Sequence, residues 1–182
     1  MAIVGIYSPG VMGSTLAYSC SLYGHSCIWA SEGRSEDTRE RASRFGIEDV
    51  STFDSLLEKS EFLFCIAKNF DPFELAKEVV SKKFSGIYVD LNAMWADSND
   101  TDLEEIFASS SVRYVEGALR GWPINNPTED DIGEKTMYLS GPHAGKVKEL
   151  FGGFWRIRTT PKSAKLLNRV LAEEMAILYG QG

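Results

Sequence analysis

Short apolar runs alternate along this chain with longer segments whose apolar residues recur at helical spacing. The pattern predicts six strands in succession and then two more, with a helix after most of them. The predicted strands cover residues 3–7, 26–30, 47–50, 62–66, 86–92, 112–115, 136–140 and 154–158. The predicted helices cover residues 11–23, 36–45, 53–59, 72–83, 101–109, 142–150 and 162–179. This alternation predicts an α/β fold with a doubly wound, mostly parallel sheet and helices on both faces. Residues 1–160 are expected to form one domain, with residues 161–182 as a long C-terminal helix.

The turn between the first strand and the first helix carries glycines at meaningful spacing. It fits G-x-G-x-x-G with Ser8 in place of the first glycine, which predicts a Rossmann-type dinucleotide site. Gly10 lets the backbone approach a pyrophosphate, Gly13 lets the helix pack on the strand, and the helix N-terminus attracts phosphate. A plain glycine-rich turn is the alternative. A P-loop is excluded, because it requires Lys and Ser or Thr where Val11 and Met12 stand. The expected cofactor contacts in this turn are Ser8, Pro9, Gly10, Val11, Met12 and Gly13.

The loop after the second strand predicts which dinucleotide is bound. In this architecture it meets the adenosine ribose, where an acid selects NAD and an arginine selects the 2′-phosphate of NADP. Ser31, Arg34 and Ser35 suit a 2′-phosphate, so NADP is expected and NAD is less favoured. Glu32 conflicts with this prediction, because it can serve the NAD role. The alternatives are that Ser35 caps the following helix and that Arg34 is a solvated loop cation.

Other polar residues follow later strands, at the edge where ligands lie in such sheets. Ala67, Lys68 and Asn69 are candidates for the central part of the cofactor, although an ordinary loop is the alternative. Asn92 follows the fifth strand, where it can meet a nicotinamide or substrate. Residues 116–123 are expected to form a loop, in which Arg120 either holds a substrate carboxylate or phosphate or pairs with the acidic residues 129–131.

Composition and charge limit the classes of partner that the protein is expected to bind. The net charge is −7, which argues against nucleic acid as the main partner. No Cys/His cluster has metal-ligand spacing, so no metal site is predicted, and no apolar run is long enough for a membrane span. The three cysteines lack framework spacing, and the N-terminus lacks a basic leader. A cytoplasmic protein acting on a small molecule is therefore expected.

Four motifs in order resemble the β-hydroxyacid dehydrogenases, the group that includes 6-phosphogluconate and 3-hydroxyisobutyrate dehydrogenases, over about residues 2 to 170. The motifs are the Gly10-Val11-Met12-Gly13 turn, the Gly33-Arg34-Ser35 loop with Thr38 and Arg41-Ala42 after it, Val89-Asp90-Leu91-Asn92, and Val115-Glu116-Gly117-Ala118. The nearest resemblance is to the branch described as 6-phosphogluconate-dehydrogenase-like and NAD-binding. It implies NADP-dependent hydride transfer to or from a small hydroxy-, keto- or imino-acid.

The resemblance also implies catalytic residues in the last helix. A family Lys near the start of this helix handles the hydroxyl proton, and an Asn four residues later supports it. Lys165 lies in the corresponding helix, with Lys162 as the second candidate, but Asn168 lies only three residues after Lys165. Residues three and four positions after a given residue lie on the same face of a helix, so proton transfer by Lys165 with support from Asn168 is still expected. A plain polar helix face is the alternative.

The family also carries a helical C-terminal domain of about a hundred residues, whereas this sequence stops at Gly182. Two apolar stripes on the last helix predict a homodimer formed through it. Two other functions stay open beside the dehydrogenase. One is a non-catalytic module that binds NADP(H), and the other is an oxidoreductase passing hydride between NADP and a deazaflavin.

Overall fold

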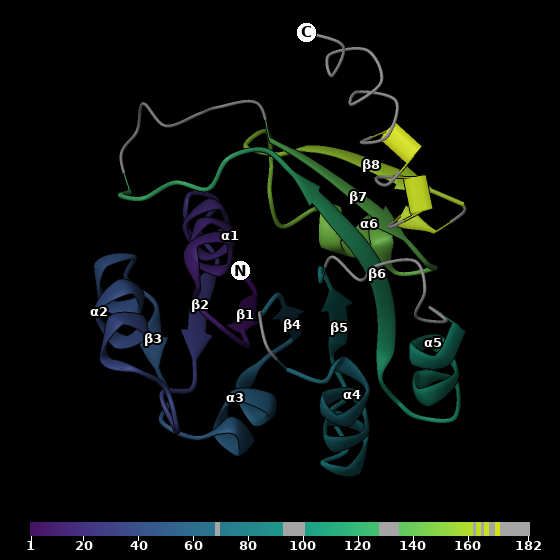
Figure 1. Cartoon of the computed structure of the whole chain (residues 1–182), viewed down its shortest axis with the longest axis horizontal. Helices are drawn as coiled ribbons and strands as arrows, with labels where there is room; N and C mark the ends of the chain where they lie inside the picture. The colour runs from purple at the N-terminus through teal and green to yellow at the C-terminus, as the bar shows by residue number, and fades with distance from the viewer. Residues whose placement is uncertain are drawn as a thin grey trace, which may run out of the picture.

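The chain folds around one eight-stranded sheet in the order β3-β2-β1-β4-β5-β6-β7-β8 (Figure 1). The computed structural model describes residues 1–67, 70–92, 101–127, 135–161, 163–164, 166–167 and 170–171. The strands are β1 (Ile3–Ile6), β2 (Ser26–Trp29), β3 (Glu48–Asp49), β4 (Phe62–Cys65), β5 (Ile87–Asp90), β6 (Arg113–Arg120), β7 (Thr136–Ser140) and β8 (Arg156–Thr160). The helices are α1 (Val11–Ser21), α2 (Glu36–Arg44), α3 (Phe53–Lys59), α4 (Pro72–Ser81), α5 (Thr101–Ala108) and α6 (Ala144–Lys148).

The predicted fold class is confirmed. Strands β1 to β6 pair in parallel, β7 runs antiparallel to β6, and β8 is parallel to β7. The strand order reverses between β1 and β4. From β1 the chain adds β2 and β3 on one side of the sheet, and it then crosses to the other side of β1 to add β4 and the later strands. In doubly wound sheets ligands bind in the crevice at such a reversal, outside the carboxyl ends of the strands.

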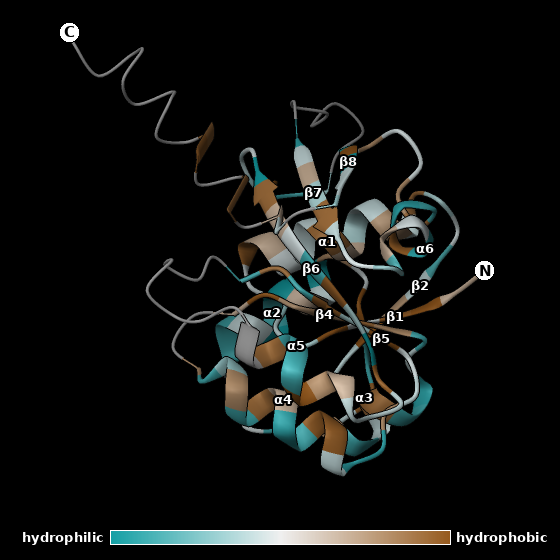
Figure 2. Cartoon of the chain, turned by 90° about the vertical axis from the view of Figure 1, so that its right-hand side faces the viewer, coloured by the Kyte–Doolittle hydropathy of each residue, from teal (hydrophilic) through white to brown (hydrophobic). Residues whose placement is uncertain are grey.

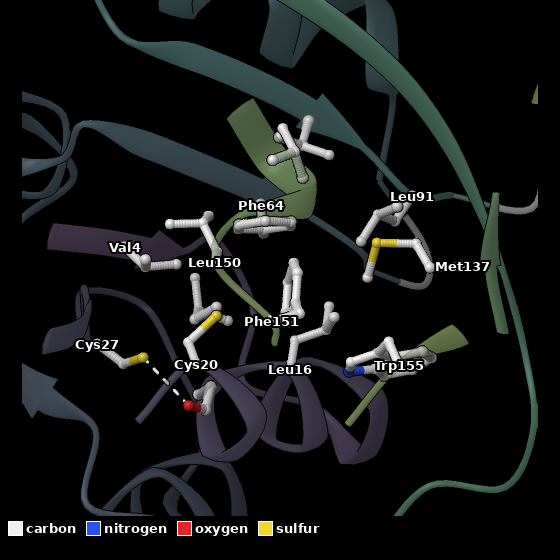
Figure 3. Packing of buried hydrophobic residues seen from close by; sticks show 14 of the residues in the cluster. Val4, Leu16, Cys20, Cys27, Phe64, Leu91, Met137, Leu150, Phe151 and Trp155 are labelled. Atoms are coloured by element: carbon white, nitrogen blue, oxygen red, sulfur yellow. Dashed lines mark hydrogen bonds between the residues drawn. The ribbon is translucent and has the colours of Figure 1, made fainter. Parts of the chain in front are cut away.

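Both faces of the sheet are covered, which explains the continuous apolar runs (Figure 2). Residues such as Val4, Phe64 and Val89 enter one core with α1 and α6, while Leu63 and Tyr88 enter a second core with α3, α4 and α5. In the first core Phe151 points toward Phe64, with the ring centroids 5.6 Å apart at 82° (Figure 3). The two cores hold the strand ends in place from both sides.

Side-chain caps fix where two of the helices begin. Asp71 accepts hydrogen bonds from the main-chain N–H groups of Phe73 and Glu74 at the start of α4, where Pro72 is the first helical residue. Thr52 accepts from the N–H of Ser55 and caps α3. These local signals are sufficient to fix where both helices begin.

The structure corrects the prediction that residues 116–123 form a loop. β6 continues to Arg120, because its second half pairs with the antiparallel strand β7 from Glu116↔Ser140 to Arg120↔Thr136. Gly117 is small for packing rather than for a turn, since a Cβ there would lie 2.4 Å from Leu91 Cδ2.

The predicted start of the last helix is also corrected. Ser163 caps it, because its Oγ accepts a hydrogen bond from the N–H of Leu166 at 3.2 Å, and the first helical residue that is described is Ala164. Residues 172–182 of the predicted helix lie outside the described residues.

Candidate functional site

The turn from β1 into α1 leaves the N-terminus of α1 open. Gly10 is the N-cap residue, with φ −65° and ψ −175°, and no side chain among the described residues caps the helix. A Cβ built on Gly10 would meet no atom within 4 Å. The first-turn N–H groups of an α-helix lack helical partners, so this open space is suited to an anion. The cofactor contacts expected of Gly10, Val11 and Met12 stay a prediction, for which this geometry leaves room.

Gly13 provides the close contact between α1 and the turn. A Cβ on Gly13 would lie 2.2 Å from the carbonyl oxygen of Ser8 and 3.3 Å from Ile6 Cγ2. Ser8 fits in place of a glycine because its φ is not positive; outside glycine, the described residues with positive φ are Ser51 and Lys83. The Oγ of Ser14 donates to the carbonyl of Pro9 at 3.1 Å, which fixes the turn from the helix side.

Two arginines flank the loop after β2. Arg34 donates from Nη2 to the main-chain oxygen of Tyr7 at 3.0 Å, and its Cζ lies 4.7 Å from the centroid of the Tyr7 ring. Arg39, which the sequence analysis did not single out, donates from Nη2 to the carbonyl of the buried Ser31 at 2.7 Å. Among the described residues, neither arginine lies within 4.0 Å of a carboxylate oxygen. Both guanidinium groups therefore keep N–H groups for an anionic ligand.

Glu32, the residue that favoured NAD, makes a contact with the start of α3. Its Oε2 accepts a hydrogen bond from the N–H of Phe53 at 3.4 Å, at the positive N-terminus of α3. The Oγ of Ser35 forms a 3.0 Å hydrogen bond with Oγ1 of Thr38 and does not cap α2, although Ser35 occupies the N-cap position. The predicted capping bond of Ser35 is therefore absent, and its exposed hydroxyl lies beside the loop.

Asp49 anchors the same loop from the end of β3. Its Oδ1 accepts from the N–H of Ser31 at 3.2 Å and from the N–H of Ser51 at 2.8 Å. Burial acts to raise the pKa of Asp49, but hydrogen bonds from Ser31 and Ser51 and the charge of Arg39 outweigh it, so the pKa lies below its usual value. The ionised form of Asp49 therefore holds the loop that presents Arg34.

Asn92 ties the carboxyl ends of β4 and β5 together. Its Oδ1 accepts from the N–H of Ala67 at 2.9 Å, and its Nδ2 donates to the carbonyl of Cys65 at 3.3 Å. Asn92 is buried, and these bonds occupy both ends of its amide. Ala67 and Asn92 thus lie together at the predicted edge, with Asn92 shaping the edge. Lys68 and Asn69 lie outside the described residues.

Tyr7, whose ring contacts Arg34, also belongs to an aromatic group formed with Phe53 and Phe70. The Tyr7 ring packs on Phe53 and Phe70 with centroid distances of 5.7 and 5.8 Å. Beside it a hollow of about 540 Å³ opens between Tyr7 and α4. Its lining includes Tyr7, Phe70, Asp71, Glu74, Lys77 and Glu78. One signal in the sequence could have indicated this group: an aromatic residue stands directly after β1, at the sheet edge where ligands lie.

The candidate substrate and catalytic residues lie farther along the sheet. Arg120 is half-buried and ends β6 opposite Thr136; the acidic residues 129–131, its alternative partners, lie outside the described residues. Lys165 and Asn168 also lie outside them. The start of their helix is described: the Oγ of Ser163 donates to Oε1 of Glu116 in β6 at 2.8 Å. The structure therefore connects this helix to β6 but does not place its catalytic candidates.

The described part of the chain offers neither the ligand group of a metal site nor a membrane-spanning helix. It contains no group of three or more His, Cys, Asp or Glu residues that is able to hold a metal ion. None of its helices has the length and apolar character needed to cross a membrane.

No family model and no curated protein sequence matches the chain. Solved structures do. A conserved protein of unknown function, described as structurally similar to 3-hydroxyacid dehydrogenases, matches with a TM-score of 0.73 at 19% identity, covering 97% of this chain and 66% of that one. A reductive aminase from Aspergillus terreus in complex with NADPH4, cyclohexanone and allyl amine matches with a TM-score of 0.74 at 15% identity, covering 98% and 62%.

An imine reductase from Myxococcus stipitatus is also similar. Its complex with NADP+ gives a TM-score of 0.67 at 18% identity, and its V8 variant in complex with NAD+ gives 0.71 at 17% identity; both comparisons cover 99% of this chain and 63% of the other. The chain thus spans slightly less than two thirds of each of these proteins. Over that length it has the Rossmann-type fold of 3-hydroxyacid dehydrogenase-like proteins and imine reductases.

Proposed function

We propose that this protein is an NADP(H)-dependent oxidoreductase. The observation that carries the proposal is Arg34: a guanidinium held at the main-chain oxygen of Tyr7, directly after β1, with no carboxylate within 4.0 Å among the described residues. A 2′-phosphate is the part of NADP that such a group recognises. The solved structures with NADPH or NADP+ on the same fold add support.

The turn from β1 into α1 and the loop after β2 have room and donors for a dinucleotide. Gly10 leaves open space where a pyrophosphate would approach the N–H groups of Val11, Met12 and Gly13. Arg34 and Ser35 would hold the 2′-phosphate, with Arg39 as a further donor. When bound, NADP(H) supplies the hydride acceptor or donor.

We further propose a small hydroxy-, keto- or imino-acid as the substrate. Arg120 would pair with its anionic group, Lys165 would hold or release the proton of the reacting group, and Asn168 would support Lys165. The imine reductases and 3-hydroxyacid dehydrogenase-like neighbours support this class of reaction. Steady NADPH oxidation with small keto- and imino-acids, lost in Lys165→Ala, is the expected result. Full activity in that variant would refute the role of Lys165.

The central experiment compares cofactors. Calorimetric titration should show tighter binding of NADPH than of NADH, and Arg34→Ala should remove the difference. Equal affinity of the wild type for both cofactors would refute the 2′-phosphate site. The spacing of Lys165 and Asn168, three residues instead of four, favours a second candidate function, a module that binds NADP(H) without turnover. Tight NADPH binding with no activity over a substrate panel would support that candidate.

We also propose that residues 1–160 form one domain, and that the chain forms a homodimer through a C-terminal helix expected over residues 161–182. Leu166 and Val170 are 46% and 40% exposed, which supports an apolar face available to a second copy. Light scattering should give a dimer mass for the wild type and a monomer mass for Leu166→Glu with Val170→Glu. A wild-type monomer would refute the proposal.

We propose a cytoplasmic location for the protein. Cys20, Cys27 and Cys65 are buried and form no disulfide, which supports a reducing compartment. Fractionation of the source cells tests this location, and recovery of the protein in an oxidising compartment would contradict it.

A further inference from the structure

The guanidinium of Arg34 is held by Tyr7 at two points. The main-chain oxygen of Tyr7 accepts one N–H of Arg34, and the aromatic ring of the same residue lies under the guanidinium at 4.7 Å. The first contact depends on the backbone alone and is present with any residue at position 7. The second requires an aromatic ring, because the attraction comes from the negative face of the ring. A ring at this position therefore adds a contact that no aliphatic residue supplies.

The ring of Tyr7 is itself fixed by neighbours from two other elements. Phe53, the first residue of α3, packs edge-on against it at 75°. Phe70, directly before the cap of α4, packs against it at 44°. With Tyr7 following β1, the ring joins three segments of the chain near the point where the strand order reverses. Arg34 consequently rests on a ring that is packed against two further rings.

We propose that Tyr7 is the positioning residue that sets the preference of this protein for a 2′-phosphorylated dinucleotide. The inference rests on the proposed NADP(H) function. An arginine side chain loses rotamer freedom when it binds a phosphate, and holding it in advance lowers that cost. NADH lacks the phosphate, so its affinity does not depend on where Arg34 lies. The ring therefore contributes to the ratio of the two affinities.

Tyr7→Leu and Tyr7→Phe form the matched pair for the test. Leu removes the aromatic face and keeps an apolar side chain, whereas Phe keeps the face and removes only the hydroxyl. Dissociation constants for NADPH and NADH are measured by calorimetry on the full chain, and the melting temperature of each variant is recorded. We expect Tyr7→Leu to weaken NADPH binding about three- to tenfold and NADH binding less than twofold. Tyr7→Phe should stay within about twofold of the wild type for both.

A double-mutant cycle separates positioning from general packing. If Tyr7 acts through Arg34, Tyr7→Leu should leave the NADPH/NADH ratio unchanged in an Arg34→Ala background. A loss of both cofactors in proportion would indicate packing alone and overturn the inference. If Tyr7→Leu does not fold, Tyr7→Met replaces it, because Met is also apolar and lacks the aromatic face. Tyr7→Met with the wild-type ratio of NADPH to NADH affinity would overturn the inference.

The outcomes distinguish this inference from the function on which it rests. A wild type without preference for NADPH overturns the proposed cofactor and the role of Tyr7 together. A wild-type preference for NADPH that Tyr7→Leu retains overturns only the role of Tyr7.

Discussion

Replacing Gly13 with Ala should destabilise the fold, because the new methyl group meets backbone. Its Cβ would lie 2.2 Å from the carbonyl oxygen of Ser8, more than 1 Å inside ordinary van der Waals contact, which begins at about 3.4 Å. Ser8 cannot swing away as a flexible side chain does, so α1 or the turn must shift. Such overpacking costs about 1–3 kcal/mol, and the helix propensity of Ala returns up to about 1 kcal/mol.

At the middle of these two ranges, the net expectation for Gly13→Ala is about 1–2 kcal/mol of lost stability, or a melting temperature about 2–8 °C below wild type for a chain of this size. Calorimetric or circular-dichroism melting measures it. NADPH affinity should also fall, because the shift displaces the N-terminus of α1. A variant as stable as wild type would refute the close contact between α1 and the turn.

Gly10→Ala is the matched control, because it separates cofactor binding from stability. Its φ of −65° suits Ala, and its Cβ would meet nothing within 4 Å. The lower preference for Ala at an N-cap opposes the entropy gained from replacing Gly, so stability should change by less than about 1 kcal/mol. NADPH affinity should fall at least about tenfold, because the methyl group occupies the proposed path of the pyrophosphate. Unchanged NADPH affinity would exclude this turn as the pyrophosphate site.

Three further variants test single contacts. Glu32→Gln should leave the NADPH/NADH affinity ratio within about twofold of wild type, because the carboxylate accepts a hydrogen bond at the N-terminus of α3. A larger change in the ratio would indicate that Glu32 contacts the ribose. Asp49→Asn should lower the urea midpoint at neutral pH. The folded pKa of Asp49 is lowered, so its contribution is present above pH about 4 and is lost as the pH falls through the folded pKa; equal pH profiles for both proteins would contradict this. Ser19→Ala should cost about 1–3 kcal/mol in urea denaturation, because it leaves the buried Trp155 indole N–H without its acceptor at 2.9 Å; Ser19→Ala combined with Trp155→Phe should cost less than the sum of the two changes, and additivity would contradict the hydrogen bond.

The core strands could be predicted because each carries its own signal. Residues 62–66 are apolar throughout, as a strand covered on both faces requires, and β4 forms there. Asp71 with Pro72 marks the start of α4 by local hydrogen-bonding chemistry alone. Such signals depend on a few neighbouring residues, so the sequence is sufficient to find them.

The length of β6 depends on a distant partner. Gly117 and Gly121 indicate a turn when only their neighbours are considered. The strand continues to Arg120 because β7 pairs with it, and Gly117 faces Leu91, the residue directly after β5. No local pattern contains that information. The same holds for the aromatic group at Tyr7, whose partners come from two other segments.

The charge of the candidate site follows from how its acidic residues are used. The whole chain carries −7, and the loop sequence places Glu32 two residues before Arg34, so the loop looks nearly neutral. In the fold Glu32 accepts from the N-terminus of α3, and Asp49 accepts from two main-chain N–H groups. Arg34 and Arg39 donate to carbonyl oxygens, with no carboxylate within 4.0 Å among the described residues. Local potential, rather than net charge, governs the binding of a small anion, so an acidic protein can present a positive site for a phosphate.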